Sequence, residues 1–293
     1  MVLEMDVWII VNPILRVFLY AASFLSLGTF LFSFHFSKHL TVVQKSYCDH
    51  LAFKTALFGS GISLLMFFSV AGNLGGDIAS VVEPLMLQLA LESKSGVGFL
   101  AAFISFMVMS MAHRLRGNAN RFGLLVSSAA LLLSFTISGH SQLGGVLSQL
   151  LLMLHLYGIA FWLGALFPFR WMCLQPDTHN LSIVAHRFGV LAMRYVTLLL
   201  SAGVGYASLL LGNVSLLVTT QYGNVLLLKI VLVAALLSLA ALNKFKLVPS
   251  LEPRWTPKVR QFQRSIEFEI AIALIILTAS SLLTTSMTLP MGM

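Results

Sequence analysis

Long apolar runs dominate the chain, and short polar segments separate them. A helix needs about 20 mainly apolar residues to cross the hydrocarbon core of a bilayer. Eight runs approach that length, and hydropathy defines their ends to within a few residues. They cover about residues 8–34, 53–70, 97–112, 122–138, 146–169, 188–211, 225–245 and 266–289. Because the runs are continuous and lack the alternation of barrel strands, they predict an all-α integral membrane protein, a bundle of eight transmembrane helices.

Basic residues alternate from loop to loop along this framework. Of the 18 Lys and Arg residues, 15 lie in or beside the loops that follow the first, third, fifth and seventh runs. The alternate loops hold Lys94 alone. Since Lys and Arg concentrate in cytoplasmic loops, we expect both termini on the periplasmic side of a bacterial inner membrane.

Composition agrees with a membrane protein. The chain is 58% hydrophobic and 10% charged, with a mean hydropathy of +0.92, whereas about a quarter of the residues in a soluble domain are charged. The net charge of +8 is explained by the basic loops and their attraction to anionic lipid, so we expect no nucleic-acid partner. The first run follows Glu4 and Asp6 rather than a basic segment, which favours a retained span over a cleaved signal peptide.

Two histidines are the leading candidates for chemistry. His155 lies inside the fifth apolar run, and His140 lies in the short loop before it. Ionisable residues within a membrane are candidates for function, and neutral imidazole binds copper, zinc, iron and nickel. The pair predicts a shallow metal site open to the outer side, with a third ligand from elsewhere. The alternative is a solvated His140 and a His155 that makes a hydrogen bond between helices.

Two charged residues also lie within spans, Lys229 in the seventh and Glu269 in the eighth. Their expected depths differ too much for a direct ion pair. We expect Glu269 to meet Asn243, Arg187 or another base near the inner edge, either to fix helix register or to couple to protons. The other six histidines, His35 among them, are expected to be solvated or interfacial.

Motifs of soluble enzyme chemistry are absent from the sequence. There is no phosphate-binding glycine loop, HExxH, CxxC or nucleophile elbow, and two cysteines cannot form a disulfide framework. We therefore expect a protein that is not an enzyme. The 13 methionines give weak support for Cu(I), which prefers soft thioether ligands, because methionine is also a common packing residue.

Four segments in the second half of the chain carry a family resemblance. They are LHLYGIAFWLGALFPF at 154–169, Arg187-Phe188 with Gly203 and Gly205, the segment 226–251 with Lys229, Asn243 and Pro249, and RSIEFE at 264–269. Together with Gly139-His140 they resemble the CopD/PcoD family of bacterial inner-membrane copper-resistance proteins, including its YebZ-like branch. Ala165 departs from the family pattern, where a second glycine often stands.

The resemblance implies a copper-binding protein of the inner membrane that takes copper from the periplasmic side for import or delivery, in copper homeostasis and resistance. It strengthens His140 and His155 as metal ligands and implies that Trp162, Gly158 and Gly164 pack around them. It also implies a separate periplasmic CopC-like donor protein. The chain is divided into a four-helix half, 1–138, and a CopD-like four-helix half, 139–293, within one membrane domain.

Several points stay open at this stage. The oxidation state of the copper, the direction of transport and the oligomeric state are not determined by the sequence. One alternative is a haem-binding electron-transfer protein, because transmembrane histidines also serve as axial haem ligands. Another is an assembly factor that holds a partner in the membrane without transporting a metal.

Overall fold

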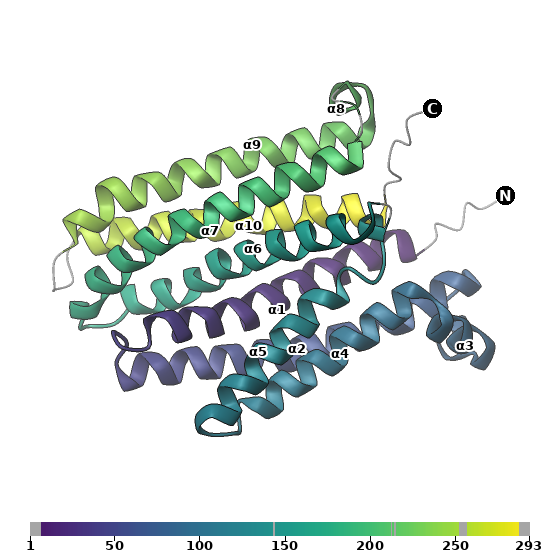
Figure 1. Ribbon diagram of the computed structural model, residues 1–293, viewed down its shortest axis with the longest axis horizontal. Coiled ribbons are helices and arrows are strands. Elements are labelled where there is room, and N and C mark those ends of the chain that lie inside the picture. Colours follow the sequence, from purple (N-terminus) through teal and green to yellow (C-terminus); the bar gives the residue numbers. More distant parts are fainter. Residues whose placement is uncertain (1–6, 143, 212, 214, 252–256, 287–293) are drawn as a thin grey trace.

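Long α-helices make up almost all of the computed structural model, which describes residues 7–142, 144–211, 213, 215–251 and 257–286. They lie side by side in an elongated bundle (Figure 1). The long helices are α1 (Trp8–Phe36), α2 (Val42–Gly75), α4 (Lys94–Ala112), α5 (Gly117–Ser134), α6 (Gly145–Cys173), α7 (His179–Leu211), α9 (Gln221–Leu242) and α10 (Pro257–Thr285). The prediction of an all-α membrane protein is confirmed at this level.

Among the described residues, seven helices are long and apolar enough to cross a membrane: α1, α2, α4, α6, α7, α9 with the turns that follow it, and α10. Helix α5 coincides with the fourth predicted span but is not one of them. It begins with the polar sequence Gly117-Asn118-Ala119-Asn120-Arg121, which lowers its hydropathy. The count of eight spans and the periplasmic position of the termini therefore stay predictions.

Several helices extend well beyond the apolar runs. Helix α2 begins at Val42, eleven residues before the predicted span, because Thr41 caps it. The Thr41 hydroxyl accepts the Gln44 N–H at 3.2 Å, and the Gln44 side chain accepts the Thr41 N–H at 2.9 Å. This capping box starts a helix irrespective of hydropathy. Lys45 and Asp49 lie in the extension, so a hydropathy scan does not detect it.

The segment between α2 and α4, predicted as an outer loop, is partly helical. It contains the short helices η1 (Ala79–Val82) and α3 (Pro84–Glu92). Before η1, the Asp77 carboxylate accepts hydrogen bonds from the Ser80 hydroxyl and N–H, both at 2.7 Å. These bonds lower the pKa of Asp77. Pro84 occupies the first turn of α3, where its missing N–H has no helical partner to lose.

Helix α1 lies at the centre of the bundle and packs on α2, α6 and α10 (Figure 1). It meets α6 backbone to backbone: a methyl group at Gly164 would lie 2.2 Å from the carbonyl carbon of Gly28. At the same crossing the Thr29 hydroxyl donates to the Gly164 carbonyl at 3.3 Å. Small residues and such side-chain bonds are how helices associate closely in a membrane.

The first and last long helices are joined directly. Near the end of the bundle where α1 begins and α10 ends, the Ser281 hydroxyl of α10 donates to the Pro13 carbonyl of α1 at 2.7 Å. The Tyr20 and Thr284 hydroxyls lie 3.3 Å apart on the same two helices. By contrast, α7 packs mainly on α6 and α9 mainly on α10, so these two helices lie on the rim of the bundle. That arrangement leaves room between α7 and α9.

Candidate functional site

The His155 ring is held by a hydrogen bond to the neighbouring helix. Its Nδ1 lies 3.0 Å from the backbone carbonyl oxygen of Leu199 on α7. Because a carbonyl oxygen only accepts, Nδ1 carries the proton and Nε2 keeps its lone pair. This is the tautomer in which imidazole binds a metal through Nε2, with the other nitrogen fixed by a carbonyl. The interhelical hydrogen bond, offered above as an alternative to metal binding, is compatible with it.

Two glycines make this geometry possible. Gly203 lies one turn after Leu199, and a methyl group there would be 2.8 Å from Nδ1 and Cε1 of His155. The missing side chain leaves the Leu199 carbonyl open to the ring. A methyl group at Gly158 would lie 2.8 Å from the Leu199 Cβ, so Gly158 permits the close approach of α6 and α7. The sequence places both glycines in the family-like segments without showing what they face.

Lys229 of α9 also belongs to this region. Its ammonium group interacts electrostatically with the His155 ring. A positive charge within electrostatic range of an imidazole opposes the binding of a further cation there. The depth of Lys229 supports this position, because it lies eight residues into α9, about 12 Å along the axis, and His155 lies ten residues into α6, about 15 Å.

The second predicted ligand lies just before α6. The backbone of His140 begins the short helix η2 (His140–Gln142), but its side chain falls outside the described part of the structure. No group of three or more His, Cys, Asp or Glu side chains among the described residues is placed to hold a metal ion. At the predicted metal site the described residues thus provide one oriented imidazole, that of His155, and its pairing with His140 stays a prediction.

A second polar centre is built around Glu269 of α10, whose side chain is 2% exposed. The indole Nε1 of Trp162 donates to Glu269 Oε2 at 3.1 Å, and Asn243 Nδ2 donates to Oε1. Asn243 is one of the partners expected for Glu269. Sequence analysis treated Trp162 as a packing residue only, although a buried tryptophan usually finds an acceptor for its N–H. The three side chains join α6, the segment after α9, and α10.

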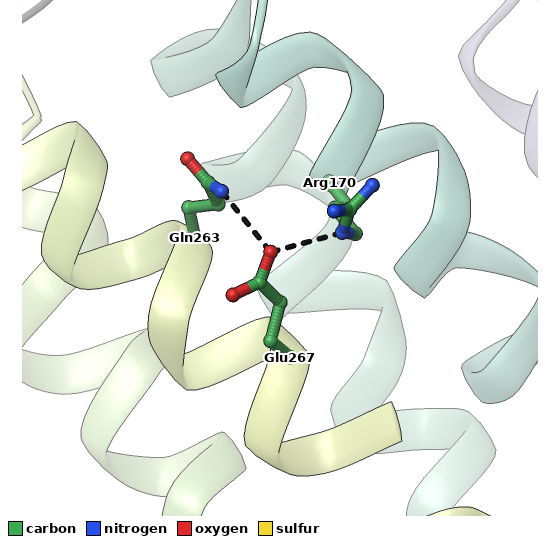
Figure 2. A network of polar contacts seen from close by, with 3 residues as sticks. All are labelled: Arg170, Gln263 and Glu267. Atoms are coloured by element: carbon green, nitrogen blue, oxygen red, sulfur yellow. Dashed lines mark hydrogen bonds and ion pairs between the residues drawn. The ribbon is translucent and has the colours of Figure 1, made fainter. Parts of the chain in front are cut away.

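Glu269 has no cationic partner among the described residues. Their ion pair between side chains joins Arg170 of α6 and Glu267 of α10 instead. Arg170 Nε lies 3.0 Å from Glu267 Oε1, which also accepts from Gln263 Nε2 at 3.0 Å (Figure 2). Both charged side chains are exposed, so the pair adds little stability. Lys229 and Glu269 form no ion pair within the described chain, as their depths predict.

A hydrogen-bonded chain of aromatic residues also joins α1, α6 and α7, and sequence analysis did not find it. His35 Nδ1 donates to the Leu31 carbonyl at 2.8 Å, so its Nε2 accepts from the Tyr195 hydroxyl at 3.3 Å. The Tyr157 and Tyr195 hydroxyls lie 3.1 Å apart. His35 is therefore packed among helices rather than fully solvated. The sequence gives little indication of this hydrogen-bonded chain, because its three residues come from three different helices, α1, α6 and α7.

Comparison with known proteins identifies the family of this chain. Residues 183–283 match the family model described as copper resistance protein D, and residues 5–150 match copper resistance protein D-like, N-terminal domain. Inner membrane protein YebZ of Escherichia coli (strain K12) is 30% identical over 237 residues, which cover 76% of this chain and 80% of that protein. The chain belongs to the CopD family. No solved structure matches it.

In this CopD-family chain, the residues of the His155 and Glu269 centres lie partly inside and partly outside the ranges that match the family models. Gly203, Lys229, Asn243 and Glu269 all lie in the range that matches copper resistance protein D. His155 and Trp162 lie between the two matched ranges, on α6. The match over 5–150 also assigns the first half of the chain to the family, whereas the segments that carried the resemblance lie in the second half.

Proposed function

We propose that this CopD-family protein binds copper from the periplasmic side of a bacterial inner membrane and passes it inward or to a membrane-bound acceptor. The observation that carries the proposal is the fixed His155 tautomer, which leaves Nε2 as a neutral nitrogen ligand next to α7. Imidazole nitrogen suits copper, and the family is that of copper resistance. The placement in the inner membrane is supported by YebZ, whose name describes an inner membrane protein.

Copper is the cargo in this proposal, and the protein performs no catalysis. His155 is the ligand within the membrane and His140 the ligand at its surface. A separate periplasmic CopC-like protein supplies the metal. Lys229 keeps the affinity of the site low through its positive charge. A transport site must bind its ion well enough to admit it and weakly enough to release it.

Copper binding is tested with the full chain in lipid nanodiscs under reducing, oxygen-free conditions. Cu(I) is titrated against a chromophoric chelator, and wild type is compared with His155→Asn and His140→Ala. The amide of His155→Asn retains a donor for the Leu199 carbonyl and removes the metal-binding nitrogen. We expect each variant to bind copper at least about tenfold more weakly, which is 1.4 kcal/mol.

The matched control is His186→Ala, because His186 is an exposed histidine of α7 outside this site. It should bind copper as wild type does. Equal copper binding by wild type, both site variants and the control would remove the proposed ligands. A Soret band in the purified protein would instead support a haem protein.

The sidedness is tested by cysteine labelling in spheroplasts. The native Cys48 and Cys173 are buried, so they give little background with a membrane-impermeant thiol reagent. We expect Asp77→Cys to be labelled from outside, because Asp77 lies in the segment between α2 and α4. Arg116→Cys, at the opposite end of α4, should be labelled only after lysis. The reverse pattern would invert the topology and the direction of copper entry.

A further inference from the structure

A cavity with a volume of about 290 Å³ lies between α6, α7, α9 and α10. It is separate from the His155 region, because Trp162 at its base lies seven residues further along α6, about 10 Å. Most of its wall is apolar and includes the rings of Phe169, Phe188 and Phe262. The cavity exists because α7 packs mainly on α6 and α9 mainly on α10. Its size approaches that of small-molecule sites, which begin at about 300 Å³.

The polar end of this cavity is made by Trp162, Asn243 and Glu269. Asn243 is 7% exposed, and its buried Oδ1 has no hydrogen-bond partner among the residues that the structure describes. Its Nδ2 already donates to Glu269, so the orientation of the amide directs Oδ1 away from that carboxylate. A buried carbonyl oxygen without a donor is unfavourable and calls for an explanation. A ligand that donates a hydrogen bond would supply one.

The Glu269 carboxylate is hydrogen-bonded but has no cationic partner among the described residues. Its two oxygens accept one hydrogen bond each, from Trp162 and Asn243, and both donors are neutral groups. No cationic side chain of the described residues forms an ion pair with it. Lys244 lines the cavity, but its ammonium lies over the ring of Phe245, 5.1 Å from the centroid. A buried carboxylate is normally paired with a cation.

The backbone at Asn243 is also unusual. Residues Asn243–Leu247 form a π-helical turn between α9 and a short 3-10 helix, Val248–Ser250. Single π-helical turns occur frequently at functional sites. Here the turn begins at the residue that faces Glu269.

We propose that this cavity binds a small amphipathic amine. The protonated amino group donates to the carboxylate of Glu269 and to Oδ1 of Asn243, and so satisfies both groups at once. The hydrocarbon part of the ligand lies against Phe169 and Phe188. The cavity lies between helices on the rim of the bundle, so such a ligand would enter from the bilayer or from the end of the bundle near Lys244.

The test measures equilibrium binding of radiolabelled n-octylamine to the full chain in nanodiscs, and empty nanodiscs correct for partition into lipid. Octanol and octanoate are the matched probes, since they share the chain length and carry a neutral or an anionic head. We expect saturable binding of octylamine at one site per chain, and at least tenfold weaker binding of both matched probes. Comparable binding of all three would show a pocket for any acyl chain and would overturn the proposal.

Three variants locate the site. Glu269→Gln should weaken octylamine binding at least tenfold, whereas Glu267→Gln, an exposed carboxylate on the same helix, should leave it unchanged. If Glu269→Gln fails to fold, Ala192→Phe fills the cavity from α7 without altering its polar end. That variant should also abolish saturable binding. Octylamine binding that survives in folded Glu269→Gln or in Ala192→Phe would overturn the assignment, as would its absence in wild type.

Discussion

Substitution of Gly203 by alanine tests the contact on which the His155 geometry depends. The added methyl group would lie 2.8 Å from Nδ1 and Cε1 of the ring, closer than carbon and nitrogen atoms pack. Either the ring moves or the two helices separate. In both cases the 3.0 Å hydrogen bond between His155 and Leu199 is lost or strained. The same displacement moves Nε2, the nitrogen proposed to bind copper.

The expected magnitude follows from three contributions. Overpacking in a tight contact costs about 1–3 kcal/mol. Loss of the hydrogen bond costs about 1 kcal/mol. Alanine is favoured over glycine within a helix by about 1 kcal/mol. We therefore expect Gly203→Ala to destabilise the protein by about 1–3 kcal/mol. In a His155→Ala background the methyl group has space, so the same change should stabilise by about 1 kcal/mol.

The coupling between the two substitutions is therefore about 2–4 kcal/mol, well above the few tenths expected for independent sites. Reversible unfolding of wild type, both single variants and the double variant in mixed micelles measures it. Gly205→Ala is the control, because a methyl group there meets only Leu151 side-chain atoms, at 3.4 Å and beyond. Additive effects of Gly203→Ala and His155→Ala would refute the contact. The Gly203→Ala protein should also bind copper more weakly than the control.

Three further predictions concern other contacts. Gly164→Ala should destabilise by more than about 3 kcal/mol or prevent folding, because its methyl group meets the α1 backbone. Gly61→Ala has open space in α2, so in the same unfolding measurement it should stabilise by about 1 kcal/mol through the helix preference for alanine. Trp162→Phe removes a hydrogen bond to a buried carboxylate and should cost about 1.5–3 kcal/mol; an unchanged unfolding free energy would contradict that bond. Lys229→Met should raise copper affinity up to about tenfold, because it removes the positive charge that acts on His155. Weaker copper binding by this variant would contradict that reasoning and would show that Lys229 supports the site.

Hydropathy was sufficient for much of the architecture, whereas the sidedness inferred from the charged loops stays a prediction. Apolar runs identified the spanning helices because burial in lipid demands continuous apolar surface, and family-like segments identified the CopD family. The runs could not give helix ends. The Thr41 capping box starts α2 far outside the bilayer-sized run, and α3 forms from Pro84 within a segment predicted as a loop. These features depend on local hydrogen bonds, to which hydropathy is insensitive.

From the sequence, single residues of the candidate sites could be predicted, but most of their partners could not. His155 and Glu269 are conspicuous because ionisable residues are rare within spans. Their partners are distant in sequence: the Leu199 carbonyl lies 44 residues from His155, and Trp162 lies 107 residues from Glu269. A backbone carbonyl has no sequence signature at all. The Leu199 carbonyl is accessible to His155 because Gly203 has no side chain. The role of Gly203 is recognisable only once the structure shows how α6 and α7 pack.

The bonds from α10 back to α1 bear on how the chain is made. A ribosome synthesises α1 long before α10, yet the Pro13 carbonyl and the Tyr20 hydroxyl of α1 meet Ser281 and Thr284 of α10. Until α10 is inserted, one side of α1 must face lipid, solvent or the insertion machinery. A chain truncated before α10 should therefore be retained as an immature, protease-sensitive product. Insertion of α10 would then be the step that closes the bundle.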